Sequence, residues 1–235
     1  MVKNSSLIHP FYPRDLNIPG YVPNDIEVST ILTVSFSGFG LAFLLSWLVA
    51  RRARSVGERL MIAWFGLSGT IHCSIELYFS IYHRTVAEDS SFLSQLWKEW
   101  GKADSRYVIS DSCIVSIESI TAWTEGPACF LIMYAFLNNA AYRHPLRIIV
   151  SLGQLYGTIA YFMVEWLDGF THGPFGDPFY FWFYFISMNS FWIVIPTLLI
   201  IQSWKELSKA QTIKDQNDLK EKESSGRNRK TKKTR

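Results

Sequence analysis

The feature that most constrains this chain is a series of long apolar segments. Residues 28–50 contain no charged side chain, and a helix of this length, at about 1.5 Å per residue, crosses the hydrocarbon core of a bilayer. Further apolar segments cover residues 60–82, 113–137, 146–166 and 179–201. Because lipid offers the backbone no hydrogen-bond partner, a single crossing segment must be helical. The sequence therefore predicts an all-α, polytopic membrane protein with a bundle of five transmembrane helices.

The third segment, 113–137, is the least certain of the five. Its first half is polar and contains Glu118, and an ionisable side chain is costly inside a membrane unless it finds a partner. An alternative with four spans, which leaves Glu118 outside the bilayer, therefore stays open at this stage.

The composition excludes several other classes of protein. Hydrophobic residues make up 49% of the chain and the formal net charge is only +3, so we expect neither a disordered chain nor a nucleic-acid partner. The mean hydropathy of +0.09 is low only because polar residues gather in the loops and at the ends. Glycine-rich phosphate-binding motifs and clusters of metal ligands are absent from the sequence, and we expect no cofactor and no metal.

The distribution of lysine and arginine predicts the orientation in the membrane. Most of these residues lie in the segments 51–59, 143–147 and 205–235, which alternate with poorly basic loops. Since short cytoplasmic loops collect basic residues, we expect a cytoplasmic C-terminus and a lumenal N-terminus. Residues 1–204 would form the membrane domain, and the basic tail 205–235 has the composition of a disordered segment. Its ending Lys-Lys-Thr-Arg resembles a dilysine retrieval signal of the endoplasmic reticulum, although so basic a tail also matches by chance.

Polar residues within the apolar segments form three groups. His72 and Glu76 are four residues apart and can hydrogen-bond on one helix face. Similar spacing relates the members of the other two groups, which are Glu118, Thr121 and Glu125, and Asn189 with Trp192. Ionisable residues in a membrane normally face the interior of a bundle and find partners there. We therefore expect these side chains to converge on one intramembrane cavity.

Such a cavity suits proton transfer on a hydrophobic substrate. A buried carboxyl group can donate a proton near neutral pH, and a histidine beside it can accept or relay that proton. Indole rings deep in their helices, such as those of Trp123 and Trp192, can meet a cation with their electron-rich faces. Isomerisation, hydration and proton-coupled transport all remain open from the residues alone.

Other polar and aromatic residues have simpler interpretations. We interpret Glu165, at the end of the fourth span, as a structural residue whose side chain extends to the membrane–water interface. An aromatic belt at the lumenal interface accounts for a further group of side chains, namely Trp97, Trp100, Tyr107, Tyr180, Trp182 and Tyr184.

Several blocks resemble the emopamil-binding protein family, the 3-beta-hydroxysteroid delta-8, delta-7 isomerases of the wider EXPERA group. The resemblance extends from the N-terminus to about Trp204 and is specific because the blocks occur in the family's order. The main blocks are HPFYP from His9, YVPND from Tyr21, the His72 and Glu76 pair, FLSQLWKEW from Phe92, DSRY from Asp104, ESITA from Glu118, RHPLR from Arg143, GQLYG from Gly153, DGFTHG from Asp168 and FYFWFYFISMNSFW ending at Trp192.

The resemblance implies a five-helix protein of the endoplasmic reticulum membrane that moves a sterol double bond from C8–C9 to C7–C8 without a cofactor. An acid protonates C9, a carbocation forms at C8, and a base removes a proton from C7. Glu118 and His72 would handle protons, Glu76 would orient His72, and Trp192 would face the carbocation. Thr121 and Asn189 would hold the carboxylate by hydrogen bonds, and Tyr107 would close the lumenal side of the pocket.

Glu125 departs from the family pattern, which leads us to expect an apolar or aromatic residue before Gly126 and Pro127. It would either face the cavity as a second acid or pair with a neighbouring helix.

Two other functions stay open, a non-catalytic binding protein like the sigma-2 receptor and a proton-coupled transporter. The expected partners are a delta-8 sterol, cationic amphiphilic drugs that mimic the carbocation, the lipid bilayer and, by resemblance, a second copy in a homodimer.

Overall fold

The computed structural model describes the backbone of residues 9–233 and the side chains of residues 9–222. Within this part of the chain all regular elements are helical, and five helical segments are long and apolar enough to cross a membrane. They are Val28–Arg52, Val56–Tyr82, Ser112–Leu137, Arg143–Leu167 and Pro178–Lys222. The five-helix prediction is confirmed. The four-span alternative is wrong, because the polar first half of the third segment continues into one long helix with Glu118 buried inside the bundle.

The helical segments are built from several elements. The α-helices are α1 (Val28–Val49), α2 (Val56–Ile71), α3 (Leu77–Tyr82), α4 (Phe92–Gly101), α5 (Ser112–Ile120), α6 (Gly126–Leu137), α7 (Arg143–Leu167) and α8 (Asn189–Lys233). Short 3₁₀ turns are η1 (Ala50–Arg52) and η3 (Ser105–Tyr107), and π-helical segments are η2 (His72–Glu76), η4 (Thr121–Glu125) and η5 (Pro178–Met188). Thus three of the five spans contain a π-helical segment.

Polar side chains fix the starts of three spans. Ser55 accepts a hydrogen bond from the backbone N–H of Glu58 at the start of α2. Asp111 caps α5, and Asp177 caps η5, each by accepting from two backbone N–H groups of the first turn. These N–H groups have no partner within the helix, and a capping oxygen satisfies them before the chain enters the membrane.

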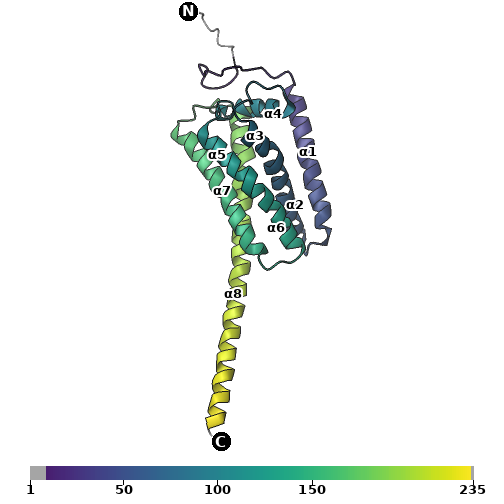
Figure 1. The fold of residues 1–235 in the computed structure, drawn as a ribbon, viewed down its shortest axis with the longest axis vertical. Coiled ribbons are helices and arrows are strands. Elements are labelled where there is room, and N and C mark those ends of the chain that lie inside the picture. Colours follow the sequence, from purple (N-terminus) through teal and green to yellow (C-terminus); the bar gives the residue numbers. More distant parts are fainter. Residues whose placement is uncertain (1–8, 234–235) are drawn as a thin grey trace, which may run out of the picture.

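The spans form an elongated bundle, in which α1 packs against α2 and α7 packs against α8 (Figure 1). The short helix α4 crosses the end of the bundle at which the N-terminal segment lies, and α8 extends beyond the opposite end (Figure 1). We call residues 9–25 together with α4 and η3 the cap.

Buried polar side chains hold the cap together. The amide of Gln95 on α4 accepts from the backbone N–H groups of Asp25 and Ile26 and donates to the Asp25 carboxylate. The ammonium group of Lys98 donates to the carbonyl oxygens of Val22 and Asp89, at 2.7 and 2.8 Å. Burial lowers the pKa of Lys98. These contacts join the N-terminal segment to α4 over one end of the bundle (Figure 1).

The tail differs from the sequence expectation. Beyond residue 204, where we expect disorder, α8 continues as a helix to Lys233. The sequence has no proline or glycine from 197 to 225, and pairs such as Glu206 with Lys209 support consecutive turns. The side chains of 205–222 are mostly exposed, as in a solvated segment. The side chains of the Lys-Lys-Thr-Arg ending lie outside the described residues.

Candidate active site

A large cavity of about 550 Å³ lies inside the described part of the bundle, and its volume is typical of small-molecule sites. The structure brings all the sequence-predicted site residues to its wall, namely His72, Glu76, Tyr107, Glu118, Thr121, Asn189 and Trp192. The remaining wall is mostly aliphatic and aromatic. The prediction that the helix bundle contains a cavity lined by these polar residues is therefore confirmed.

The cavity extends from the cap to the outer surface of the bundle. Trp97 and Trp100 of α4 contribute to its wall at the cap. Phe36 of α1 and Phe191 of α8 also line it, yet these two side chains are 46% and 47% exposed. The cavity thus approaches the surface of the bundle between α1 and α8.

Each π-helical segment carries or adjoins site residues. The segment η2 begins at His72 and ends at Glu76, η4 begins at Thr121 and ends at Glu125, and η5 ends just before Asn189. A π-helical turn widens the helix locally and changes which side chains share a face, and such turns are frequent at functional sites. The sequence spacing alone did not predict them.

His72 is held through both of its ring nitrogens. Its side chain is buried, and Nδ1 lies 2.8 Å from Oε2 of Glu76, the contact expected from their four-residue spacing. On the other side of the ring, Nε2 lies 3.2 Å from the amide nitrogen of Gln154 on α7. The imidazole is therefore oriented by a carboxylate and an amide.

Glu118 is joined to the cap. The hydroxyl group of Tyr107 donates a hydrogen bond of 2.5 Å to Oε1 of Glu118. Burial, together with the charge of Glu118, raises the pKa of Tyr107 well above its usual range. Tyr107 therefore remains a hydrogen-bond donor at neutral pH, and it contacts the carboxyl group directly rather than only closing the pocket.

Thr121 and Asn189 do not hold the carboxylate as expected. The Thr121 hydroxyl donates to the carbonyl oxygen of Ile117, and the Asn189 amide donates to that of Phe185, each within its own helical segment. Both donors satisfy backbone carbonyls close to π-helical turns. Both side chains still line the cavity.

Trp192 lies beside the imidazole. Its ring centroid is 6.1 Å from that of His72 and 5.4 Å from that of Trp64, which also lines the cavity. Trp123, the other indole considered from the sequence, is 60% exposed and donates to Ser80 on the outside of the bundle. Only Trp192 of these two can present its face to a ligand in the cavity.

The aromatic-belt interpretation is largely wrong. Trp97 and Trp100 on α4, Tyr107 on η3 and Tyr184 on η5 all line the cavity. Trp182 is 57% exposed and is the member of the group that best fits a belt.

Glu125 lies on the cavity wall, packed against α7. A Cβ atom added to Gly153 would lie 2.3 Å from Oε1 of Glu125, so the glycine leaves room for this carboxyl group. Its Oε2 atom is buried and has no hydrogen-bond partner among the described side chains and backbone. Of the two possibilities left open, a position on the cavity wall is the one observed.

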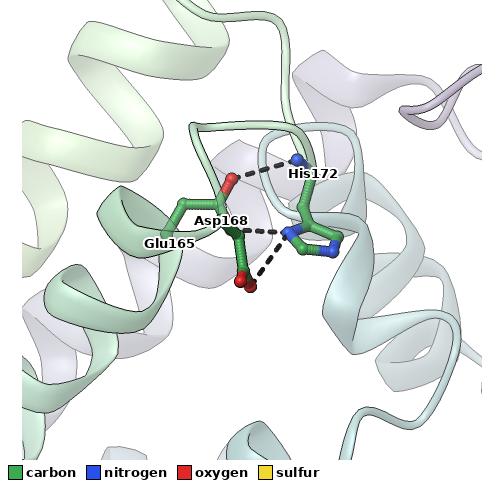
Figure 2. Close-up of side chains that lie close together, drawn as sticks. All are labelled: Glu165, Asp168 and His172. Atoms are coloured by element: carbon green, nitrogen blue, oxygen red, sulfur yellow. Dashed lines mark hydrogen bonds and ion pairs between the residues drawn. The ribbon is translucent and has the colours of Figure 1, made fainter.

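Glu165 does not reach the interface as expected but is buried in a charged network. Its Oε2 atom lies 2.7 Å from Nδ1 of His172 and 3.4 Å from Nε of Arg106 (Figure 2 shows Glu165, Asp168 and His172). Glu165, Asp168 and His172 each offer one possible metal-ligand atom, and these atoms lie within 4.8 Å of one another, a spacing that suits a metal ion. Because Arg106 already supplies positive charge to Glu165, the arrangement is a structural ion-pair network, which agrees with a structural role for Glu165.

Sequence reasoning missed Gln154. This buried amide lines the cavity and contacts His72, but an uncharged residue was not singled out among the acids and histidines. A signal was available, since Gln154, Thr158 and Tyr161 follow one face of the fourth span and all three line the cavity.

Comparison with known proteins identifies the family. The EXPERA (EXPanded EBP superfamily) model matches residues 92–203. The chain is 44% identical to a protein of Rattus norvegicus named 3-beta-hydroxysteroid-Delta(8),Delta(7)-isomerase, over 94% of this chain and 97% of that protein. Proteins with the same name in Mus musculus and Cavia porcellus are each 42% identical, over 94% and 92% of this chain and 97% and 96% of theirs.

The fold and cavity define a polytopic membrane protein with ionisable side chains in its interior. The chain belongs to the EXPERA family, and the matches with relatives extend over nearly its whole length.

Proposed function

We propose that this protein is an intramolecular sterol isomerase that moves the double bond of a 3-beta-hydroxysteroid from C8–C9 to C7–C8. Two independent observations support this function. Relatives named for this reaction match nearly the full chain, and the cavity places three carboxyl groups, a histidine and several indole rings around a space suited to a hydrophobic ligand.

The reaction is balanced by two proton transfers. An acid gives a proton to C9, and the electrons of the C8–C9 double bond form the new C9–H bond, which leaves a carbocation at C8. A base then takes a proton from C7, and the electrons of that C–H bond form the C7–C8 double bond. Two positioned groups, one acid and one base, therefore suffice.

Glu118 and the His72–Glu76 pair fill these two roles in our proposal. In each carboxyl group a protein contact holds one oxygen, Oε1 of Glu118 by Tyr107 and Oε2 of Glu76 by His72. Glu76 and Glu118 both line the cavity, and this position supports the proposal that the second oxygen of each carboxyl group meets the sterol. The other oxygen of each carboxyl group has no hydrogen-bond partner among the described residues, and this arrangement is the structural observation that carries the proposal.

Trp192 stabilises the cation in this account. An indole face attracts a positive charge placed within about 6 Å of the ring centroid, most strongly where water is excluded. The same property leads us to propose cationic amphiphilic amines as ligands of the cavity. The protein would act in the endoplasmic reticulum membrane with its N-terminus in the lumen, as a homodimer.

Expression in a yeast strain that lacks delta-8 isomerase tests the function. Wild-type protein should restore delta-7 sterols, and an equally expressed Glu118→Gln variant should not. Accumulation of delta-8 sterols with well-expressed wild type would favour the alternative, a sterol-binding protein without catalysis.

A further inference from the structure

Gln154 contacts His72 but has no part in the proton transfers proposed above. Its side chain is buried at 3% exposure on α7 and faces the imidazole of His72 across the bundle. The atoms in contact are both nitrogens, Nε2 of Gln154 and Nε2 of His72, at 3.2 Å. A hydrogen bond between them requires that the amide donate and that Nε2 of His72 carry no proton.

The other side of the imidazole has a fixed role. Nδ1 of His72 lies 2.8 Å from Oε2 of Glu76, and since a carboxylate can only accept, the geometry assigns the proton of this hydrogen bond to Nδ1. A carboxylate accepts this hydrogen bond from the neutral ring and from the imidazolium alike. Any change in the charge of His72 therefore takes place at Nε2, the atom that Gln154 holds.

The amide can satisfy Nε2 in either state. Its Oε1 atom is buried and accepts no hydrogen bond from the described residues, and the other contact of its nitrogen is a long one, 3.8 Å from Sγ of Cys129. A half-turn about the last side-chain bond would exchange the N–H and carbonyl groups and give up only this weak contact. The carbonyl oxygen could then accept from a protonated Nε2.

We propose that Gln154 is a positioning residue that holds His72 in both protonation states, donating to the neutral imidazole and accepting from the imidazolium after rotation of its amide. The expected effect of Gln154 on catalysis rests on the proposed isomerase function, whereas its contact with His72 does not.

Several other ionisable groups surround the imidazole and bear on its titration. Glu76 lies on the same span, Glu118 and Glu125 line the cavity from the third span, and the thiols of Cys73 and Cys129 lie nearby. The test must therefore compare variants of Gln154 in which all of these groups are unchanged.

Three full-length variants in detergent or nanodiscs distinguish the possible roles. Gln154→Leu can neither donate nor accept, and Gln154→Glu, when ionised, can accept only. Ser151→Ala is the matched control, because Ser151 is also buried on α7 and its hydroxyl has no partner among the described residues. For each variant, kcat and KM are measured against pH, and the unfolding temperature is measured against pH.

Gln154→Leu should lower kcat about 10- to 100-fold with little change in KM, a loss like that seen when residues that orient a metal-bound imidazole are replaced. Gln154→Glu should move the limb of the kcat profile that reports His72 to higher pH by about one unit or more, since a carboxylate at Nε2 favours the charged ring. The control should match wild type. Unmoved profiles with equal losses of kcat in both Gln154 variants would indicate a merely structural residue and overturn the proposal.

The unfolding measurements need no catalysis, so they test the proposal even if the protein is not an isomerase. Gln154→Leu should lower the unfolding temperature at both acidic and alkaline pH, because the amide serves both states. Gln154→Glu should lower it mainly at alkaline pH, where the neutral ring has lost its donor. If Gln154→Leu lowered the unfolding temperature only at acidic pH or only at alkaline pH, the result would contradict the proposal. Failure of the wild type to convert a sterol would contradict the proposed function instead.

Discussion

The hydroxyl group of Tyr107 donates a 2.5 Å hydrogen bond to Oε1 of Glu118, and so joins the cap to the buried carboxyl group of the cavity. Tyr107 is itself packed against Trp97, with ring centroids 4.8 Å apart in a stacked arrangement. The position of the carboxyl group therefore depends on the cap, in which neither η3 nor α4 belongs to one of the five spans.

Tyr107→Phe should lower kcat/KM by about 10-fold or more, because hydrogen bonds to charged groups contribute about 1.5–3 kcal/mol. The raised pKa of Tyr107 keeps its hydroxyl protonated, so the loss should be similar from pH 6 to about pH 9. Tyr156→Phe, at a residue 73% exposed on α7, is the control. Wild-type kinetics in Tyr107→Phe would show that this contact is not used.

Gly153→Ala should force the carboxyl group of Glu125 to move, since the added Cβ would lie 2.3 Å from its Oε1 atom. We expect a loss of stability of about 1–3 kcal/mol, as for other overpacked sites. The double variant with Glu125→Ala should recover most of it, because the two changes act on one contact. Gly157→Ala is the matched control, with its nearest neighbour, Cγ2 of Ile117, at 3.8 Å. Additive effects in thermal unfolding would argue against this packing.

His172 should make the stability of the cap depend on pH. Its hydrogen bond with Glu165 raises the pKa of His172 above the ordinary value of 6.5. The other charged groups near the ring are Asp104, Arg106 and Asp168. Below pH 6.5 the ring is protonated in the folded and unfolded states, and the stabilisation is fully present. It is lost as pH rises through the folded-state pKa. The unfolding temperature should fall over this window in wild type and fall less in His172→Gln. Identical slopes would refute the assignment.

An amphiphilic tertiary amine, protonated at neutral pH, should compete with the sterol for the cavity, whereas its uncharged carbon analogue should bind less well. Trp192→Leu should weaken amine binding by about 1–2 kcal/mol through loss of the indole face, and Glu118→Gln should weaken it through loss of charge. Scintillation or fluorescence competition measures both effects. Equal affinities for the charged and uncharged ligands would contradict a cation-binding role for this wall.

Much of the architecture could be predicted from sequence, because lipid permits few structures. Apolar length located the spans, and intramembrane polar residues such as His72 and Glu118 pointed to a cavity. Helical spacing also placed Glu76 within reach of His72. These predictions depend on contacts within one span or on the cost of burying charge.

The remaining details depend on contacts between spans. The bond from Gln154 to His72 joins residues 82 positions apart, and no local pattern specifies it. The π-helical turns change the register at His72 and Thr121, and the position of α4 over the bundle end places Trp97 and Trp100 in the cavity wall. Uncharged side chains such as Gln154 give a weak signal in sequence but carry specific geometry.

The most direct test is to incubate the purified protein with a delta-8 sterol in D₂O and to locate deuterium in the product by mass spectrometry and NMR. We expect delta-7 sterol with one solvent-derived deuterium at C9, and no conversion by a folded Glu118→Gln variant. Delta-7 sterol without deuterium at C9, or full conversion by that variant, would contradict protonation of C9 by the acid group of this cavity.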